Sequence, residues 1–172
     1  MLTGKKVILR PIQLDDWGKT LAWRNDLFLK SSTMAHPFPV TEEMEKAWYE
    51  EKLLKKDNSF LPFTVVTAGE GTVAGYFSLN NINWISGNGF VSGVIGERGN
   101  MGKGMGREAV ELLLDYAFNH LKLHKICAYV RTDHPAMKTW IETGAVIEGT
   151  LREHFFSGGQ YHDVNILAWF SR

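Results

Sequence analysis

The sequence predicts an α/β domain of the α+β kind, with a mixed, mostly antiparallel central sheet and helices on both faces. Three strand patterns follow one another without a helix between 61 and 96, and a strand-helix-strand pattern follows over 88–132. The chain has 172 residues, of which 44% are hydrophobic and 22% are charged, as in an ordinary globular protein. We therefore expect one domain, residues 1–172.

The spacing of apolar residues along the chain predicts the helices and strands. Residues 15–25 place apolar side chains at helical intervals behind an acidic cap, and residues 104–120 do so with acidic residues on the opposite side. The loop 31–39 is irregular and apolar, so it is either a connector or a lid. The full prediction is strands 6–12, 61–68, 72–83, 88–96, 123–132, 146–154 and 161–170, with helices 15–25, 41–56, 104–120 and 135–143.

A glycine-rich segment lies between a predicted strand and a predicted helix. Gly99, Gly102, Gly104 and Gly106 fall within eight residues, after the strand that ends near Ile95. Free backbone N–H groups and the positive end of the helix dipole meet at a helix N-terminus, and glycine lets an anion approach the backbone. The segment is either a phosphate cradle, with a pyrophosphate as the natural ligand, or a turn that binds nothing.

Two known phosphate motifs do not fit this segment. A P-loop requires Ser or Thr after Gly-Lys, but Gly104 follows Lys103 here. The glycines also stand in the wrong order for a dinucleotide-binding fingerprint, and the preceding chain does not begin a βαβ unit. The P-loop motif is absent, and the sequence argues against dinucleotide binding of the Rossmann type.

Met101-Gly-Lys-Gly-Met-Gly106 instead resembles the acyl-CoA pyrophosphate loop of the GNAT N-acetyltransferase superfamily, usually Gln/Arg-x-x-Gly-x-Gly/Ala. Met101 replaces the usual Gln or Arg, which leaves the backbone cradle intact. Three further segments extend the resemblance over nearly the whole chain and place it nearest the branch that acetylates ribosomal-protein N-termini. They are Val7–Ile12 with Asp15-Asp-Trp17, Leu21–Asp26, and Gly144–His154 with Gly158–Asp163.

This resemblance implies direct acetyl transfer from acetyl-CoA to an amine in a ternary complex, with no metal. The coenzyme would lie beside strand 88–96, with Lys103 and Arg107 supplying charge near its phosphates. The implied cofactor-binding residues are Ile95, Met101, Gly102, Lys103, Gly104, Met105, Gly106, Arg107, Asp133, Lys138 and Trp140.

The reaction needs groups that deprotonate the amine and reprotonate the departing thiolate. In the family, a Tyr often serves as the thiolate's acid, but Trp140 occupies that position, and an indole N–H cannot release its proton near neutral pH. Asp133, where the family has Asn, is either a base or a cap of the following helix. The catalytic candidates are Glu97, Asp133, His134 and Tyr161, with His36 and His162 as further acid–base candidates.

Arg24 lies on the apolar face of helix 15–25 and needs a partner, either a protein carboxylate or an acceptor-bearing substrate. Asn25 and Asp26 are expected to end that helix. The predicted substrate-binding residues are Arg24, His36, Trp84, Tyr161 and Asp163, with Trp84 and Phe155 as apolar walls.

The composition limits the classes of partner and the compartment that we expect for this chain. Nineteen basic and nineteen acidic residues give zero net charge, which argues against a sequence-independent nucleic-acid binder. Cys127, the single cysteine, lies in an apolar strand and is expected to be buried. No signal peptide or membrane span is recognisable, so the expected compartment is the cytoplasm.

The acceptor is the open question. A small amine, such as an amino sugar, polyamine, amino acid or aminoglycoside, is favoured over a protein N-terminus, because no strip of charge suggests a macromolecular partner. The alternatives are a non-catalytic acyl-CoA sensor and a transferase of longer acyl chains. Exposed strand edges and the aromatic strand Ile166–Phe170 leave room for a homodimer.

Overall fold

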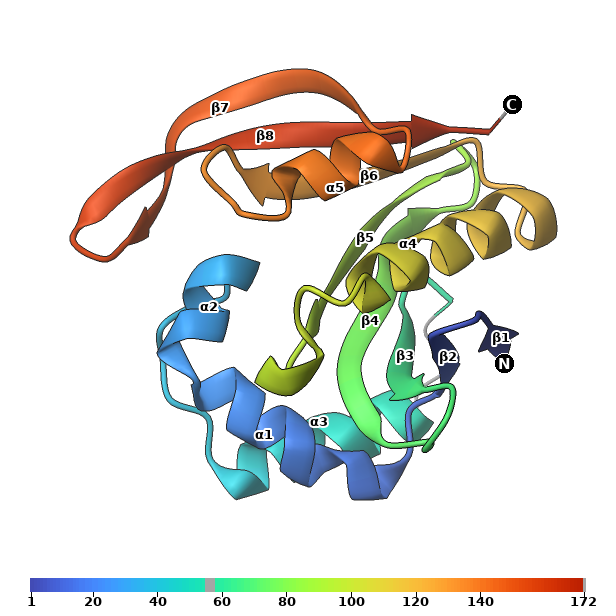
Figure 1. Cartoon of the computed structure of the whole chain (residues 1–172), viewed down its shortest axis with the longest axis vertical. Coiled ribbons are helices and arrows are strands. Elements are labelled where there is room, and N and C mark those ends of the chain that lie inside the picture. Colours follow the sequence, from blue (N-terminus) through green and yellow to red (C-terminus); the bar gives the residue numbers. More distant parts are fainter. Residues whose placement is uncertain (55–57, 172) are drawn as a thin grey trace.

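An eight-stranded sheet runs through the molecule in the order β1-β2-β3-β4-β5-β6-β8-β7 (Figure 1). This computed structural model describes residues 1–54 and 58–171. Neighbouring strands pair antiparallel except β5 and β6, which are parallel, so the predicted mixed sheet is confirmed. The strands are β1 Leu2–Thr3, β2 Val7–Pro11, β3 Leu61–Thr67, β4 Val73–Asn83, β5 Asn88–Ile95, β6 Lys125–Arg131, β7 Val146–Ser157 and β8 Gln160–Phe170.

The helices agree with the predicted ones except near the N-terminus. They are α1 Trp17–Asn25, α2 Leu27–Thr33, α3 Glu42–Leu54, α4 Met105–Asp115 and α5 Met137–Glu142, with shorter turns at Leu14–Asp16, Arg98–Asn100 and Tyr116–His120. Asp26 ends α1 as expected, but its carboxylate also accepts the N–H groups of Phe28 and Leu29 and starts α2. α2, like the short β1, was missed, and it takes up the first residues of the predicted loop 31–39. The last two residues of the predicted helix 41–56 lie outside the described residues.

The two faces of the sheet are covered by different helices. The apolar side of α4, with Val110, Leu113 and Leu114, packs into the main core with Phe77 and Leu79 of β4. The other face meets α1 and α3, where the rings of Trp48 and Tyr76 lie 6.0 Å apart. Cys127 is buried as expected, and burial raises the pKa of its thiol. No helix among the described residues has the length and apolarity needed to cross a membrane.

β5 and β6 separate soon after they meet. Their pairing covers only Asn88–Phe90 against Lys125–Cys127, whereas β5 stays paired with β4 up to Ile95. β6 stays paired with β8 up to Arg131. Figure 1 shows β4 and β5 running away from β6 and β8, with α2 facing the far end of the β7–β8 hairpin. Among the described residues, one edge of β5 therefore has no strand beside it from Val91 onward.

Gly96 fixes the chain where β5 ends and the glycine-rich segment begins. A Cβ on Gly96 would lie 2.1 Å from Cδ2 of Trp23, so the indole of α1 packs directly against this backbone. Trp23 is buried, and the Gly96 N–H donates to the carbonyl of Ala74. The close approach ties α1 to the start of the glycine-rich segment.

We expect Gly96→Ala to destabilise the protein by about 1–3 kcal/mol, because the added methyl group overlaps the Trp23 ring. The loss should lower the Tm by about 2–4 °C for each kcal/mol. Gly69→Ala is the matched control, because nothing lies within 4 Å of a Cβ at that position. Equal Tm values for the two variants would show that the Trp23 contact does not constrain this position.

Candidate active site

The glycine-rich segment forms a turn that leads directly into α4. Gly102 and Gly104 have φ values of +71° and +80°, which L side chains rarely adopt, and Gly104 is the N-cap of α4. Within the described chain, the N–H groups of Gly102, Lys103 and Gly104 have no hydrogen-bond partner. The first N–H groups of any α-helix also lack an intrahelical acceptor. The turn thus presents a group of free donors at the positive end of a helix dipole.

The N-terminal hairpin holds this turn in place. Lys6 Nζ donates to the carbonyl of Lys103 at 2.7 Å. The Glu108 carboxylate, in the first turn of α4, accepts the N–H groups of Lys5, Lys6 and Val7 at 3.0, 2.7 and 2.8 Å. Burial raises the pKa of Glu108, but these backbone donors outweigh it and the pKa is lowered.

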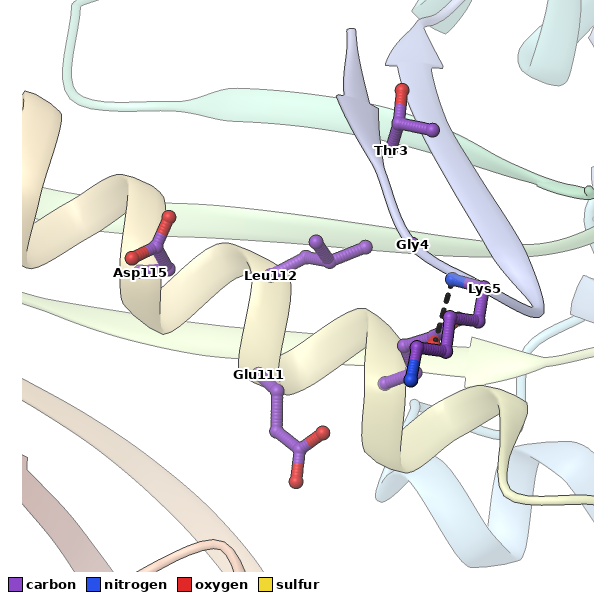
Figure 2. A pocket seen from close by; sticks show the side chains of 7 residues that line it. Thr3, Gly4, Lys5, Glu111, Leu112 and Asp115 are labelled. Carbon is purple, nitrogen blue, oxygen red and sulfur yellow. Dashed lines mark hydrogen bonds between the residues drawn. The ribbon is translucent and has the colours of Figure 1, made fainter.

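Figure 2 shows the groove that these contacts border, about 590 Å³ in volume, between the N-terminal hairpin and α4. Its lining residues are Thr3, Gly4, Lys5, Glu108, Glu111, Leu112 and Asp115. Because Glu108 is committed to backbone N–H groups, its role in this groove is to support the neighbouring turn.

Arg107, in the first turn of α4, and Lys138 of α5 each lie within 4.0 Å of a carboxylate. Arg107 contacts Glu111 at 2.8 Å and Glu142 of α5 at 3.3 Å, so it links α4 to α5. Lys138 is exposed and lies 3.8 Å from the same Glu142. Ile95 and Met105 pack against the core, and a Cβ on Gly106 would lie 3.5 Å from Ile95. Met101–Arg107 thus form one continuous segment that covers the glycine turn and the first residues of α4.

Trp140 has a packing role. Its ring lies 5.7 Å from that of Trp169 and packs against the main core. The Trp169 indole N–H donates to Thr143 Oγ1, and this hydrogen bond holds the Trp169 ring at the end of α5. The indole that replaces the family's Tyr thus anchors α5 to β8.

Asp133 belongs to an ion-pair network at the end of β6. Its carboxylate accepts two hydrogen bonds from Arg131, at 2.6 and 2.8 Å, and lies 3.1 Å from His162 Nδ1. The hydrogen bonds from Arg131 lower the pKa of Asp133 to about 2. His134, rather than Asp133, accepts the backbone N–H of Ala136 before α5, and burial lowers the pKa of His134.

The same network joins α2 to the β7–β8 hairpin. Arg131 Nη1 donates to Ser31 Oγ at 2.9 Å, and Ser157 Oγ donates to the same oxygen at 2.9 Å. His162 Nε2 lies 3.1 Å from the carbonyl of Ser157. The sequence analysis missed Ser31, Arg131 and Ser157, because no local pattern indicates partners 100 or 126 residues apart.

Other predicted residues have protein partners. Glu97 pairs with Lys19 at 2.8 Å. Arg24 pairs with buried Glu45 at 2.8 Å. Of the two partners expected for Arg24, a protein carboxylate or a substrate, the structure shows the protein carboxylate.

Two of the predicted substrate residues lie at the β7–β8 end. Tyr161 is exposed near the tip of the β7–β8 hairpin, with its ring 5.0 Å from that of Phe156. Asp163 accepts the N–H of Glu153 at 2.8 Å.

The structure does not bring Trp84 into this group. Asn83 pairs with Asn88, and Asn88 pairs with Lys125, so Trp84 lies at the end of the sheet where β6 begins. Tyr161 lies beyond the opposite end of β6, where Arg131 pairs with Val164. Trp84 instead donates to the carbonyl of Asn58. His36 is exposed, with its ring 5.5 Å from that of Phe38.

A turn of free N–H groups at the start of a helix, beside a strand with an open edge, is a candidate site for a phosphate-containing ligand. Residues 6–143 match the family described as acetyltransferase (GNAT) domain. The chain belongs to this family and is an N-acetyltransferase that uses acetyl-CoA.

Similar proteins share almost the whole chain. A probable N-acetyltransferase, YjcK, of Bacillus subtilis is 31% identical, with 98% of this chain and 96% of that protein covered. A spermidine N(1)-acetyltransferase of Vibrio cholerae is 31% identical, with coverage of 94% and 91%. The crystal structure of spermidine N-acetyltransferase from Vibrio cholerae with CoA and spermine gives a TM-score of 0.89 at 28% identity, covering 98% of this chain and 97% of that one.

We expect Gly104→Ala to weaken acetyl-CoA binding by about tenfold or more, because a side chain at this positive φ strains the turn that presents the donors. Isothermal titration gives the Kd. Gly99→Ala is the control from the same segment, since Gly99 has no positive φ and no atom within 4 Å of an added Cβ. A Gly104→Ala protein with the wild-type Kd would disprove the cradle.

The stability contributed by Asp133 should depend on pH. Its folded-state pKa is about 2, below the ordinary 3.8, so the contribution is complete above pH 3.8 and is lost as the pH falls towards 2. We expect the Tm difference between the wild type and Asp133→Asn to be constant near neutral pH and to shrink over that window. A Tm difference that does not change with pH would contradict the lowered pKa of Asp133.

Proposed function

We propose that this acetyltransferase acts on the primary amine of a small molecule, by direct transfer in a ternary complex. The observation that carries the proposal is the open edge of β5 from Val91 onward, which is followed, after the short turn Arg98–Asn100, by the free N–H groups of the glycine turn. The pyrophosphate of acetyl-CoA would bind at the turn. The pantetheine arm would run along β5 and hydrogen-bond its unpaired backbone, which brings the thioester between β5 and β6.

The side chains around this position favour an amine that arrives without its proton. Glu97 and Asp133 are both held in ion pairs, so neither carboxylate is free to act as a strong base. Direct attack by a neutral amine needs no covalent intermediate on the protein. The open β5 backbone can stabilise charge on the thioester oxygen, and solvent can return a proton to the thiolate.

Polyamines are the first acceptor class to assay, because the Vibrio cholerae relatives are spermidine acetyltransferases. Amino sugars and amino acids form the next group. The contacts of Ser31 with Arg131 and Ser157 join α2 to the β7–β8 hairpin beside the opening between β5 and β6. This bridge favours a slender small molecule over the N-terminus of a folded protein.

Saturating acetyl-CoA at about 100 times its Kd should stabilise the protein by about 2.7 kcal/mol, seen as a higher Tm. Free adenosine nucleotides are the control. Release of free thiol should then depend on an added amine, with spermidine compared with amino sugars, amino acids and peptides. Stabilisation by acetyl-CoA without thiol release from any amine would indicate a sensor and contradict the proposal.

A further inference from the structure

Three neutral polar side chains form a cluster on β4 and β5. The Asn80 amide nitrogen donates to Ser92 Oγ at 2.8 Å and to Ser78 Oγ at 3.3 Å. The two hydroxyl oxygens lie 3.2 Å apart. Ser78 is 1% exposed, whereas Ser92 is exposed, so the cluster reaches from the interior to the surface.

The register places this cluster where β5 leaves β6. Phe90 and Cys127 form the last β5–β6 pair, and Ser92, two residues on, lies on the same face of β5 as Phe90. α4 packs against the opposite face, which carries Leu79 and Val91. Ser92 therefore projects from the open part of β5, on the side away from α4.

An aromatic pair adjoins the cluster on this face. The rings of Phe90 and Tyr129 stack with centroids 5.3 Å apart, and Tyr129 is 46% exposed. The pair spans the point at which β5 and β6 begin to diverge. It offers an apolar surface beside a hydroxyl group.

After the hydrogen bonds within the cluster are counted, one acceptor position remains available to a ligand. Asn80 spends both amide hydrogens on the two hydroxyl oxygens. When Ser92 donates its own hydrogen to buried Ser78, one lone pair of Ser92 Oγ remains, on the exposed side. That lone pair can accept an N–H from a ligand, and none of the three side chains carries a charge.

We propose that Ser92, oriented by Asn80 and Ser78, binds the reacting nitrogen of the acceptor, while the carbon chain of the acceptor packs on Phe90 and Tyr129. A neutral hydroxyl acceptor stabilises the ammonium ion much less than a carboxylate would, so the bound amine loses its proton more easily. The preferred ligand is thus a primary amine on an unbranched apolar chain. This inference rests on the proposed function and names the amine subsite within it.

Ser92→Ala should lower kcat/KM for the best amine by about tenfold or more, because it removes the acceptor for the amine N–H. The Kd for acetyl-CoA should stay at the wild-type value. Ser92→Thr keeps the hydroxyl and should retain most of the activity. Ser86→Ala, in the β4–β5 turn at the far end of the strand, is the control and should match the wild type.

Asn80→Asp tests the charge argument with an isosteric side chain. A carboxylate beside the bound amine favours the ammonium ion, so the rise of kcat with pH, which reports ionisation within the complex, should move upward by about one pH unit. A variant with a purely structural defect would lose rate without moving this profile.

Two results would overturn the inference in distinguishable ways. Wild-type turnover that Ser92→Ala leaves unchanged would disprove the subsite alone. A wild type that releases no thiol with any amine would disprove the proposed function and the subsite together.

Discussion

β5 and β6 exchange hydrogen bonds over only three residue pairs before they separate. Each strand keeps its other neighbour, β4 or β8, so the sheet remains continuous while one edge of β5 is left open. Backbone groups on an open edge must find other partners. The glycine turn follows this edge after the short turn Arg98–Asn100, and its N–H groups are also unpaired in the described chain. One interruption in strand pairing thus sets out two adjoining surfaces for a long phosphate-bearing ligand.

Contacts between residues far apart in sequence, both apolar and polar, hold the elements on both sides of this interruption. Trp23 on Gly96 and Lys6 on Lys103 fix the β5 side. On the β6 side, Arg131 binds both Asp133 and Ser31, so an ion pair on one strand also reaches α2. The halves of the sheet diverge between β5 and β6 but are joined again through side chains at the β7–β8 hairpin. The open edge is therefore held in a defined shape by partners far apart in sequence.

The features predicted from sequence were those set by neighbouring residues. Glycine spacing and helical periodicity located the turn at 101–106 and α4, and apolar runs located the longer strands. α2 was missed because Asp26, which ends one helix, also caps the next. Trp84 was expected near Tyr161, but strand register places these residues at opposite ends of β6, and register cannot be deduced from composition. Arg24 illustrates the same limit: its apolar setting indicated a partner, yet only the packing of α3 identified Glu45.

The three amides on Glu108 make the first hairpin a part of the proposed coenzyme site, although it lies about 100 residues away in sequence. A protease that cleaved this hairpin would free the Glu108 carboxylate and remove the Lys6 contact from the glycine turn. Binding at the glycine turn should also affect cleavage of the hairpin. Coenzyme that orders the turn would shield the hairpin from digestion, so proteolytic resistance of the first few residues reports on occupancy of a site formed by the middle of the chain.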